Sequence, residues 1–371
     1  MPAVPSKPTV TVLIDTYNHE RFVEEAIVSV LEQDFPAADM EILVVDDGST
    51  DGTPEIVRKF APSVRYLRKE NGGQASAFNF GIPQAQGEIV AFLDGDDWWA
   101  AHKLRAVMDV FEKNPRVGTV GHGIVEVESA ADRNTALAPG ITGYFDLISD
   151  DGAQIFRNFM AFLGTSRVTI RKSVLAKVLP IPDALVIEAD EFMSTMAVAH
   201  GGAFLLPDAL TFYRLHGGNL FQFDSGDPVR IRRKLNVLES LASALPAQLA
   251  SAGIARSAVA IIVEPIRTAA ARMRLSLDGG KPWETYRVER EDFQHSYHHV
   301  TAGYRVYKQL SLLLALVLPP RVYYNLRRIY AEGDMRRYRS WLGDPKPKAD
   351  VRKAELGTEN LPPGLLQNDR K

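Results

Sequence analysis

The amino-acid sequence predicts an α/β fold in which a mostly parallel sheet is flanked by helices. In the first half of the chain, short apolar and β-branched runs alternate with segments of helical periodicity, a pattern typical of strands joined by helical crossovers. Ile89–Leu93 is apolar without alternation, which favours a parallel strand covered on both faces. After about Asp227 the chain becomes rich in Ala and Leu, and this change predicts a helical C-terminal region.

Each expected strand of the first half ends at polar residues and leads toward the next helix. Thr53 is a candidate N-cap for one of these helices, and Pro54 suits its first position. The strands are expected at residues 9–14, 41–45, 64–67 and 89–93, and the helices at residues 19–33, from 53 onward, and 75–82.

The rest of the chain is expected to contain further mixed structure and then long helices. Residues 129–151 have little regularity and predict a loop. The other elements are expected as helices at 100–114, 154–163 and 187–199, strands at 117–127, 167–170, 203–206 and 210–215, and helices at 230–252, 255–277 and 292–318. These elements divide the chain into three expected parts: an α/β domain at 1–225, a helical region at 226–342, and a charged tail at 343–371 that we expect to be disordered.

Composition and charge exclude several classes of protein. The 371 residues are 46% hydrophobic and 24% charged, as in ordinary globular proteins, and the net charge of −3 predicts no nucleic-acid partner. The absence of Cys excludes disulfides and thiolate metal sites. Met1–Pro8 lacks the apolar core of a signal peptide, and Leu310–Leu318 is shorter than the about 20 residues that cross a bilayer. We therefore expect a cytoplasmic protein.

Three carboxylates follow the strand at 89–93 within four positions: Asp94, Asp96 and Asp97. Open α/β sheets bind ligands just beyond the carboxyl ends of such strands. Three acids there repel one another unless a cation lies among them, and Mg²⁺ or Mn²⁺ takes oxygen ligands, often shared with substrate phosphates. The segment predicts a metal site for a phosphorylated substrate, and the alternative is a solvated acidic turn.

Two other loops at strand ends have residues suited to a nucleotide. Asp46 and Asp47 end the second strand, where a carboxylate can accept hydrogen bonds from a ribose or a base, and Gly48 permits close backbone approach. Asn71 and Gly73 belong to a loop that opens a helix, whose free N–H groups favour anions. Each loop alone is also compatible with a structural turn, and neither common glycine-rich nucleotide motif is present.

Together these motifs resemble those of the family 2 glycosyltransferases of the GT-A fold. The resemblance depends on Asp15–Asn18, Val44–Asp51, Asn71–Gly73 with the helix that follows, and Phe92–Asp97, in the family's order and spacing. It covers residues 9–115 closely and residues up to 220 more loosely. It implies a GT-A, Rossmann-like sheet, a nucleoside diphosphate sugar as donor, a divalent cation, and inversion at the anomeric carbon.

The resemblance implies roles for the nucleotide-binding loops. Thr16 and Tyr17, with Asn18 in the same motif, would lie along the nucleoside. Asp47 matches the family's acid that reads the base, and Asp46 is its neighbour.

It also implies roles for the acids after the fourth strand, which match the family's Asp-x-Asp motif. Asp94 would lie near the ribose, and Asp96 would hold Mg²⁺ or Mn²⁺ on the diphosphate. Asp97 could substitute for either. The cation would offset the charge that builds up on the leaving diphosphate.

A general base for the acceptor hydroxyl is expected in the segment Glu188–Phe192. Aligning the end of the following helix with the family pattern implies that Asp190 is the base. The residue before it is Ala189, where the family usually has an acid, so Glu188 and Glu191 remain alternatives. The simpler interpretation is that these acids only favour a helix N-terminus.

Three other residues are candidates for contact with the metal or the substrate. Arg214 and His216 lie in a segment that also resembles the family: His216 could approach the metal or the diphosphate, and Arg214 could neutralise phosphate. Trp99 could stack on a donor or acceptor sugar, but an indole at this position is equally compatible with a core residue.

The helical region has a composition with two interpretations. Apolar and aromatic residues precede Pro319, and a basic cluster follows it. This is typical of an interfacial membrane helix and would suit a lipid-linked acceptor. The alternative is a helix pair that packs on the catalytic domain or on a second subunit in a homodimer.

The sequence thus predicts a metal-dependent inverting glycosyltransferase of the hexosyltransferase type. Its donor would be a UDP-sugar, and its acceptor a hydroxyl of a cell-surface polysaccharide or glycolipid, used in the cytoplasm or at the inner face of the cytoplasmic membrane. Two alternatives remain: a noncatalytic protein that binds sugar nucleotides or glycans, and a sugar-nucleotide pyrophosphorylase, whose glycine-rich N-terminal loop is missing.

Overall fold

A computed structural model describes residues 8–128, 133–216, 228–296 and 302–332. The chain divides into two compact units: residues up to 222 with residues 244–261, and residues 223–243 with residues 262–350. Residues 244–261, which we expected in the helical region, are thus grouped with the α/β part. The tail expected at 343–371 lies outside the described residues.

The first unit is built on one ten-stranded mixed sheet. Its strands are β1 (Val10–Thr16), β2 (Met40–Asp46), β3 (Arg65–Arg68), β4 (Ile89–Asp94), β5 (Trp98–Trp99), β6 (Thr119–Glu128), β7 (Arg133–Leu137), β8 (Gly143–Phe145), β9 (Thr169–Arg171) and β10 (Ala203–Leu215). The order along the sheet is β3-β2-β1-β4-β9-β6-β10-β5, with β7 paired to β6 and β8 to β10. The first four strands pair in parallel, as the sequence predicted.

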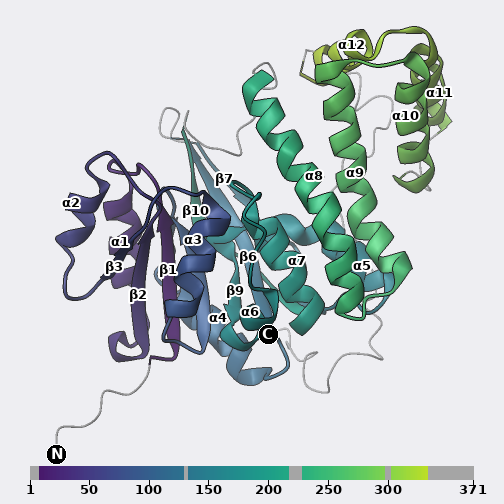
Figure 1. The fold of residues 1–371 in the computed structure, drawn as a ribbon. Coiled ribbons are helices and arrows are strands. Elements are labelled where there is room, and N and C mark those ends of the chain that lie inside the picture. Colours follow the sequence, from purple (N-terminus) through teal and green to yellow (C-terminus); the bar gives the residue numbers. More distant parts are fainter. Residues whose placement is uncertain (1–7, 129–132, 217–227, 297–301, 333–371) are drawn as a thin grey trace, which may run out of the picture. The chain divides into compact units, whose positions relative to one another are not determined.

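Helices flank this sheet, as Figure 1 shows. Those of the first unit are α1 (Val23–Leu31), α2 (Thr53–Arg58), α3 (Gln74–Gly81), α4 (Lys103–Lys113), α5 (Asp150–Phe159), α6 (Lys172–Val178) and α7 (Ala189–Gly201). The crossovers through α1, α2 and α3 follow the predicted alternation of strand and helix.

The core of the first unit is centred on β1. Val10, Val12 and Ile14 point to one face of the sheet and Leu13 to the other, and all four side chains are fully buried. Because both faces are covered, the strand needs no polar alternation. This explains why the apolar runs of β1 and β4 predicted buried parallel strands correctly.

Several elements differ from the sequence prediction. The two strands expected near residues 203–206 and 210–215 form the single strand β10, which tolerates Pro207 because its pairing with β6 shifts register between Leu205 and Ala209. The expected loop at 129–151 contains β7, β8 and the start of α5. Trp98 and Trp99 form a short strand that precedes the helix.

The helices beyond residue 227 are α8 (Pro228–Ser251), α9 (Arg256–Asp278), α10 (Pro282–Ser296), α11 (Ala302–Val317) and α12 (Pro320–Glu332). Residues 292–318, which we expected to be mostly helical, fall in α10 and α11, and residues 297–301 between them lie outside the described ranges. None of the helices in the described ranges is long and apolar enough to cross a membrane.

Candidate active site

The candidate site lies at the edge of the sheet where β1, β2 and β4 end. The register of the parallel strands aligns Thr16 with Asp46 and Asp15 with Asp94. Motifs that are far apart in sequence therefore meet at one edge, where open α/β sheets bind ligands. This part of the sequence prediction is confirmed.

Asp47 organises the loop that follows β3. Its carboxylate accepts hydrogen bonds from the N–H groups of Gly72 (3.0 Å) and Gly73 (2.7 Å) and from Lys69 Nζ (2.7 Å), and its carbonyl accepts one from Asn71 Nδ2 (3.0 Å). The N–H groups that we expected to meet phosphate are thus already bonded to a carboxylate. The loop is a structural partner of Asp47, and contact of Asp47 with a base stays a prediction.

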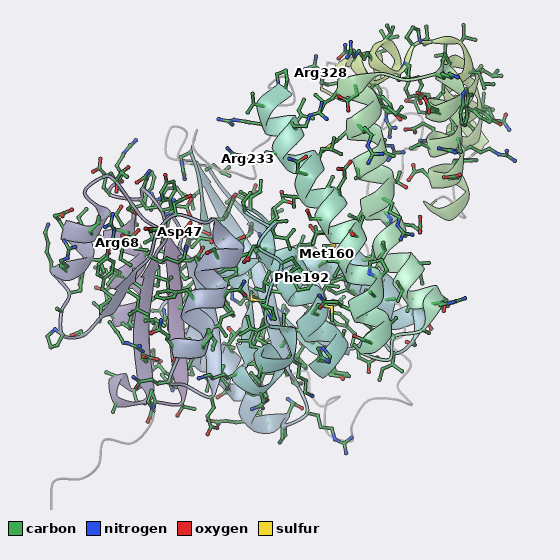
Figure 2. All side chains as sticks on the ribbon, viewed as in Figure 1. Asp47, Arg68, Met160, Phe192, Arg233 and Arg328 are labelled. Carbon is green, nitrogen blue, oxygen red and sulfur yellow. The ribbon has the colours of Figure 1, made fainter. Side chains whose placement is uncertain are left out.

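An open pocket of about 600 Å³ lies beside this loop and is lined by Gly48, Arg68, Lys69, Glu70 and Asn71. Its volume is within the range of small-molecule sites. Figure 2 shows Asp47 and Arg68 on this side of the first unit.

Gly48 is required for the shape of the pocket. Its φ of +82° lies in the left-handed region, and a Cβ there would come within 2.7 Å of the Asn71 nitrogen. Only glycine satisfies both conditions. The structure thus shows Gly48 in a tight turn against the Asn71 backbone, and close approach of a ligand to it stays a prediction.

Asp46 is directed into the protein. Its side chain is fully buried, accepts a hydrogen bond from the Ser49 N–H (2.7 Å), and accepts another from the Tyr66 hydroxyl. Burial and the carboxylate together raise the pKa of Tyr66. Asp46 therefore fixes the end of β2, and the structure does not support the nucleotide contact that we expected for it.

The three residues after Asp15 have different environments. Tyr17 is 44% exposed, whereas Thr16 is buried with its Oγ1 atom 3.3 Å from His19 Nδ1. The Asn18 backbone has a φ of +56°, and its Oδ1 accepts a hydrogen bond from the Thr50 N–H (2.8 Å). Tyr17 and Asn18 are both exposed, and Tyr17 offers an aromatic ring surface to a nucleoside. Thr16 is buried, and the Asn18 side chain is bonded to the Thr50 loop.

Asp15 and Asp94 form a half-buried carboxyl pair on neighbouring strands. Burial, followed by the charge of Asp96, raises the pKa of Asp15, while burial and the charge of Asp15 raise that of Asp94. The Oδ1 atom of Asp15 has no hydrogen-bond partner among the described residues. A cation or a hydrogen-bond donor from a substrate would satisfy this arrangement.

Asp96 is held between two imidazoles. Its Oδ2 atom lies 3.1 Å from His216 Nε2 and 3.8 Å from His19 Nε2. Burial alone would raise the pKa of Asp96, but the hydrogen bond from His216 and the charge of His19 lower it below its usual value. Asp96 is therefore the ionised member of the acidic motif. His216 lies against its carboxylate, and contact of His216 with a metal or a diphosphate stays a prediction.

Asp97 is directed away from the site, and our prediction of a metal ligand at this position is not supported. Its side chain is buried, with Oδ2 at 2.5 Å from Ser166 Oγ and Oδ1 accepting the Arg214 N–H at 3.0 Å. Burial and the charge of Asp96 raise the pKa of Asp97 to about 8. Both carboxylate oxygens of Asp97 therefore have hydrogen-bond partners within the protein.

Asp190 reaches the same site from the first turn of α7. Its Oδ2 accepts a hydrogen bond from the Thr165 N–H (3.1 Å), and its Oδ1 accepts one from the Glu191 N–H (3.1 Å). Its negative charge contributes to the raised pKa of Asp94 and of Asp15. The candidate base and the acidic motif are thus brought together, whereas Glu188 precedes α7 with a left-handed φ of +56°.

Arg214 packs beside the acidic motif. Its Nε donates to the Asp96 carbonyl (3.1 Å), its guanidinium lies 4.4 Å from the centre of the Trp98 ring, and it forms an ion pair with Glu25. The positive charge is near the site, but these contacts give it a structural role. Neutralisation of phosphate by Arg214 stays a prediction.

Trp99 belongs to the core. It is 3% exposed, its Nε1 donates to the Ser166 carbonyl (2.8 Å), and Lys103 Nζ lies 3.5 Å from its ring centre. The expected stacking on a sugar is therefore wrong, because the face of the ring is covered by the protein.

Sequence reasoning missed four residues of the site. Asp15 and His19 lie within or beside a motif that was noted, but only the strand register and the loop geometry bring them to Asp94 and Asp96. Ser166 and Arg167 had no local signal. Ser166 contacts Asp97, and the charge of Arg167 lowers the pKa of Asp97.

A metal would need ligands from outside the protein to complete its coordination. In the ranges that the structure describes, no group of three or more His, Asp or Glu side chains is arranged to hold a metal ion. Mg²⁺ often uses only one or two carboxylates together with substrate phosphates. The ionised Asp96, the nearby His216 and the unsatisfied Asp15 oxygen fit an ion of this kind, with a diphosphate supplying the remaining oxygens.

Comparison with known proteins identifies the family. Residues 11–176 match the model described as Glycosyl transferase family 2. An uncharacterized glycosyltransferase of Nostoc sp. is 36% identical over 220 residues, 57% of this chain and 66% of that protein. The poly(ribitol-phosphate) beta-N-acetylglucosaminyltransferase TarS of Staphylococcus aureus is 40% identical over 92 residues, 24% of this chain and 16% of that protein.

A solved structure supports the fold. S. aureus TarS in complex with UDP-GlcNAc superposes with a TM-score of 0.51 and 19% identity, over 79% of this chain and 94% of that chain. The chain spans less than two thirds of the length of the two curated relatives above. The sheet is that of GT-A-like glycosyltransferases, and residues 11–176 of the chain form a glycosyl transferase family 2 domain.

Proposed function

We propose that this chain transfers a sugar from a UDP-sugar to an acceptor hydroxyl, with inversion at the anomeric carbon and with Mg²⁺ or Mn²⁺. One observation carries the proposal: two adjacent residues contact both acids, since the Thr165 N–H donates to Asp190 Oδ2 (3.1 Å) and the Ser166 hydroxyl donates to Asp94 Oδ2 (3.2 Å). The candidate base and the candidate donor-binding acids therefore belong to one site, beyond the ends of β1 and β4.

The nucleotide would bind at the pocket beside Gly48. Tyr17 offers an exposed ring for stacking on a base, and Arg68 and Lys69 bring positive charge to the pocket lining. Asp47 holds the loop that forms one wall. The name of the S. aureus relative, an N-acetylglucosaminyltransferase, is compatible with such a donor.

Asp190 would accept the proton of the acceptor hydroxyl as that hydroxyl attacks the anomeric carbon. The Thr165 N–H at 3.1 Å orients its Oδ2 atom, and the Glu191 N–H at 3.1 Å orients Oδ1. Both bonds hold the carboxylate in one orientation at the site.

Asp96 and His216, with Asp94 beside them, would hold the cation, which supplies positive charge for the leaving diphosphate. Acceptor recognition would involve a glycan or a lipid-linked glycan of the cell surface, used in the cytoplasm or at the inner face of the cytoplasmic membrane.

The test separates binding from turnover. The melting temperature is measured with UDP, GDP, dTDP or CMP, with and without Mn²⁺, since a ligand of the folded state raises it. Donor turnover is then followed as released nucleoside diphosphate. We expect a UDP shift that Asp190→Asn keeps, and a loss of turnover of about a hundredfold or more in that variant.

Glu191→Gln is the matched control, because it alters the neighbouring acid in the same helical turn. It should retain most of the turnover. Equal turnover in Asp190→Asn and the wild type would reject Asp190 as the base. Nucleotide binding without any turnover would favour a noncatalytic sugar-nucleotide-binding protein. Formation of a nucleoside triphosphate and a sugar 1-phosphate from the donor and inorganic pyrophosphate would favour a pyrophosphorylase.

A further inference from the structure

One face of α11 is both apolar and exposed. The exposed apolar residues of α11 recur at intervals of three and four positions, which aligns them along one side of the helix. Each of the five side chains is between 53% and 76% exposed. They are Val306, Leu310, Leu313, Leu314 and Val317. Scattered apolar side chains are common on protein surfaces, but a contiguous helical stripe marks an interaction site.

The stripe continues on α12, where Val322 and Leu326 are 44% and 51% exposed. These two residues are one helical turn apart. We refer to the seven exposed side chains as the α11–α12 face. The other side of the two helices is well packed, since Ala315, Tyr323 and Tyr324 are buried in one hydrophobic cluster.

A buried ion cluster holds these helices in place. Glu289 of α10 is 1% exposed, and its carboxylate accepts two hydrogen bonds from Arg272 of α9, at 2.7 and 3.0 Å. Arg327 of α12 approaches it to 2.6 Å and Lys308 of α11 to 3.8 Å. Side chains from four helices therefore meet at Glu289, and this ion cluster fixes α11 and α12 against α9 and α10.

The charge around the face is positive. Residues 302–332 contain five Lys or Arg residues and a single acid, Glu332; Lys308 and Arg327 are paired with Glu289, and the other three are Arg305, Arg321 and Arg328. Residues 228–234 of α8, in the same unit, add four basic residues and no acid. Arg232 of α8 donates to the Asp278 carboxylate (3.0 Å) and Arg321 of α12 donates to the neighbouring Leu277 carbonyl (3.0 Å), so the basic end of α8 lies near the start of α12. Figure 2 labels Arg233 and Arg328 among these residues.

This charge distinguishes between the possible occupants of the face. In a symmetric dimer the same patch meets itself, which would bring two strongly basic segments together. An anionic lipid surface instead attracts Lys and Arg and accepts apolar side chains between its headgroups. We propose that the α11–α12 face binds the surface of an anionic lipid bilayer, with both helices lying in the plane of the headgroups.

The test uses the full chain and lipid vesicles, and it does not depend on the proposed enzyme activity. Cosedimentation is measured with vesicles of phosphatidylcholine alone and of phosphatidylcholine mixed equally with phosphatidylglycerol. The wild type should bind only the anionic vesicles, and more weakly at high salt. The triple variant Leu310→Gln, Leu313→Gln, Val317→Gln should bind at least about tenfold more weakly, because it removes apolar insertion but keeps the charge.

A charge variant and an apolar control complete the design. Arg233→Gln with Arg328→Gln should weaken binding by about fivefold for each arginine. Ile148→Gln removes an apolar side chain that is 75% exposed in the other unit and should bind like the wild type. Circular dichroism and the melting temperature check that each variant is folded.

Three results would overturn the proposal. The first is absence of binding to the anionic vesicles, and the second is equal binding to neutral and anionic vesicles. The third is a wild-type dimer in sedimentation equilibrium that the triple variant converts to a monomer, because a second copy would then cover the face.

Discussion

The Oγ atom of Ser166 lies 2.5 Å from Oδ2 of Asp97. The same hydroxyl is 3.2 Å from Oδ2 of Asp94, and the Ser166 carbonyl accepts hydrogen bonds from Trp99 Nε1 and Thr211 Oγ1. One small residue thus connects the acidic motif to β5 and β10. A serine without any motif signal determines how the carboxylates of the site are oriented.

Replacing this serine should destabilise the protein and reorient the acids. Ser166→Ala leaves the buried Asp97 oxygen without its hydroxyl partner, which costs about 1–3 kcal/mol. We expect the free energy of unfolding in urea to fall by that amount and metal-dependent UDP affinity to fall with it. Ser251→Ala, at an exposed serine of α8, should change stability by less than about 0.5 kcal/mol. Unchanged stability in Ser166→Ala would contradict the role assigned to this hydroxyl.

The neighbouring acids Asp96 and Asp97 should respond differently to the same substitution. Asp96→Asn removes the ionised oxygen beside His216 and should weaken Mn²⁺-dependent UDP binding by at least about tenfold. Asp97→Asn alters a buried residue with two protein partners, so its main effect should be a lower free energy of unfolding. Calorimetric titration of UDP with and without Mn²⁺ and urea denaturation measure the two effects. A larger loss of Mn²⁺-dependent binding in Asp97→Asn would reverse the assignment.

Gly48→Ala tests whether the pocket depends on close backbone approach. The new Cβ would meet the Asn71 nitrogen at 2.7 Å, in addition to the strain of a φ of +82°. Gly140→Ala is a matched control, because Gly140 also has a positive φ, +68°, but nothing lies within 4 Å of the position that its added methyl group would occupy. Both variants should lose about 1 kcal/mol of stability from backbone strain. Only Gly48→Ala should also weaken UDP binding, and equal UDP affinities in the two variants would exclude the close-approach argument.

The parts of the site that the sequence predicted are those with a local signal. Asp94 and Asp96 follow an uninterrupted apolar strand, and parallel strands bring their ends to one edge whatever the rest of the fold does. The direction of each side chain was not predictable in this way. Asp97 turns inward because Ser166 and the Arg214 N–H, 69 and 117 residues away, offer it hydrogen bonds.

In the fold, too, elements that depend on their own residues were predicted, and elements that depend on contacts distant in sequence were not. The strands and helices of the first 95 residues were predicted because each has its own apolar period. The single strand β10 was not, since Pro207 normally ends a strand and only the register shift against β6 lets it continue. Trp99 was ambiguous for a similar reason: its burial depends on Lys103 and Ser166, which local sequence does not connect to it.

Lys103 is a buried amine in the core of the first unit. It is fully buried, its Nζ donates to Thr169 Oγ1 at 3.1 Å, and it has no ion pair among the described residues. Burial holds the pKa of Lys103 well below its usual range. Because the pKa is depressed in the folded state, the unfolded chain binds a proton that the folded chain does not, over the window between the two pKa values. The contribution of Lys103 to stability should therefore rise with pH toward the unfolded pKa of about 10.4.

Lys103→Met should remove this dependence, because methionine fills a similar volume without taking up a proton. The free energy of unfolding, measured in urea from about pH 6 to about pH 9, should be higher in the variant at the acid end, and the difference should shrink as pH rises. The pKa of His122 is lowered by burial and by the charge of Lys103, so the difference between the two proteins also contains a contribution from His122. Lys113→Met, at an exposed lysine of α4, should give a curve parallel to the wild type. A parallel curve for Lys103→Met would mean that the amine stays protonated in the core.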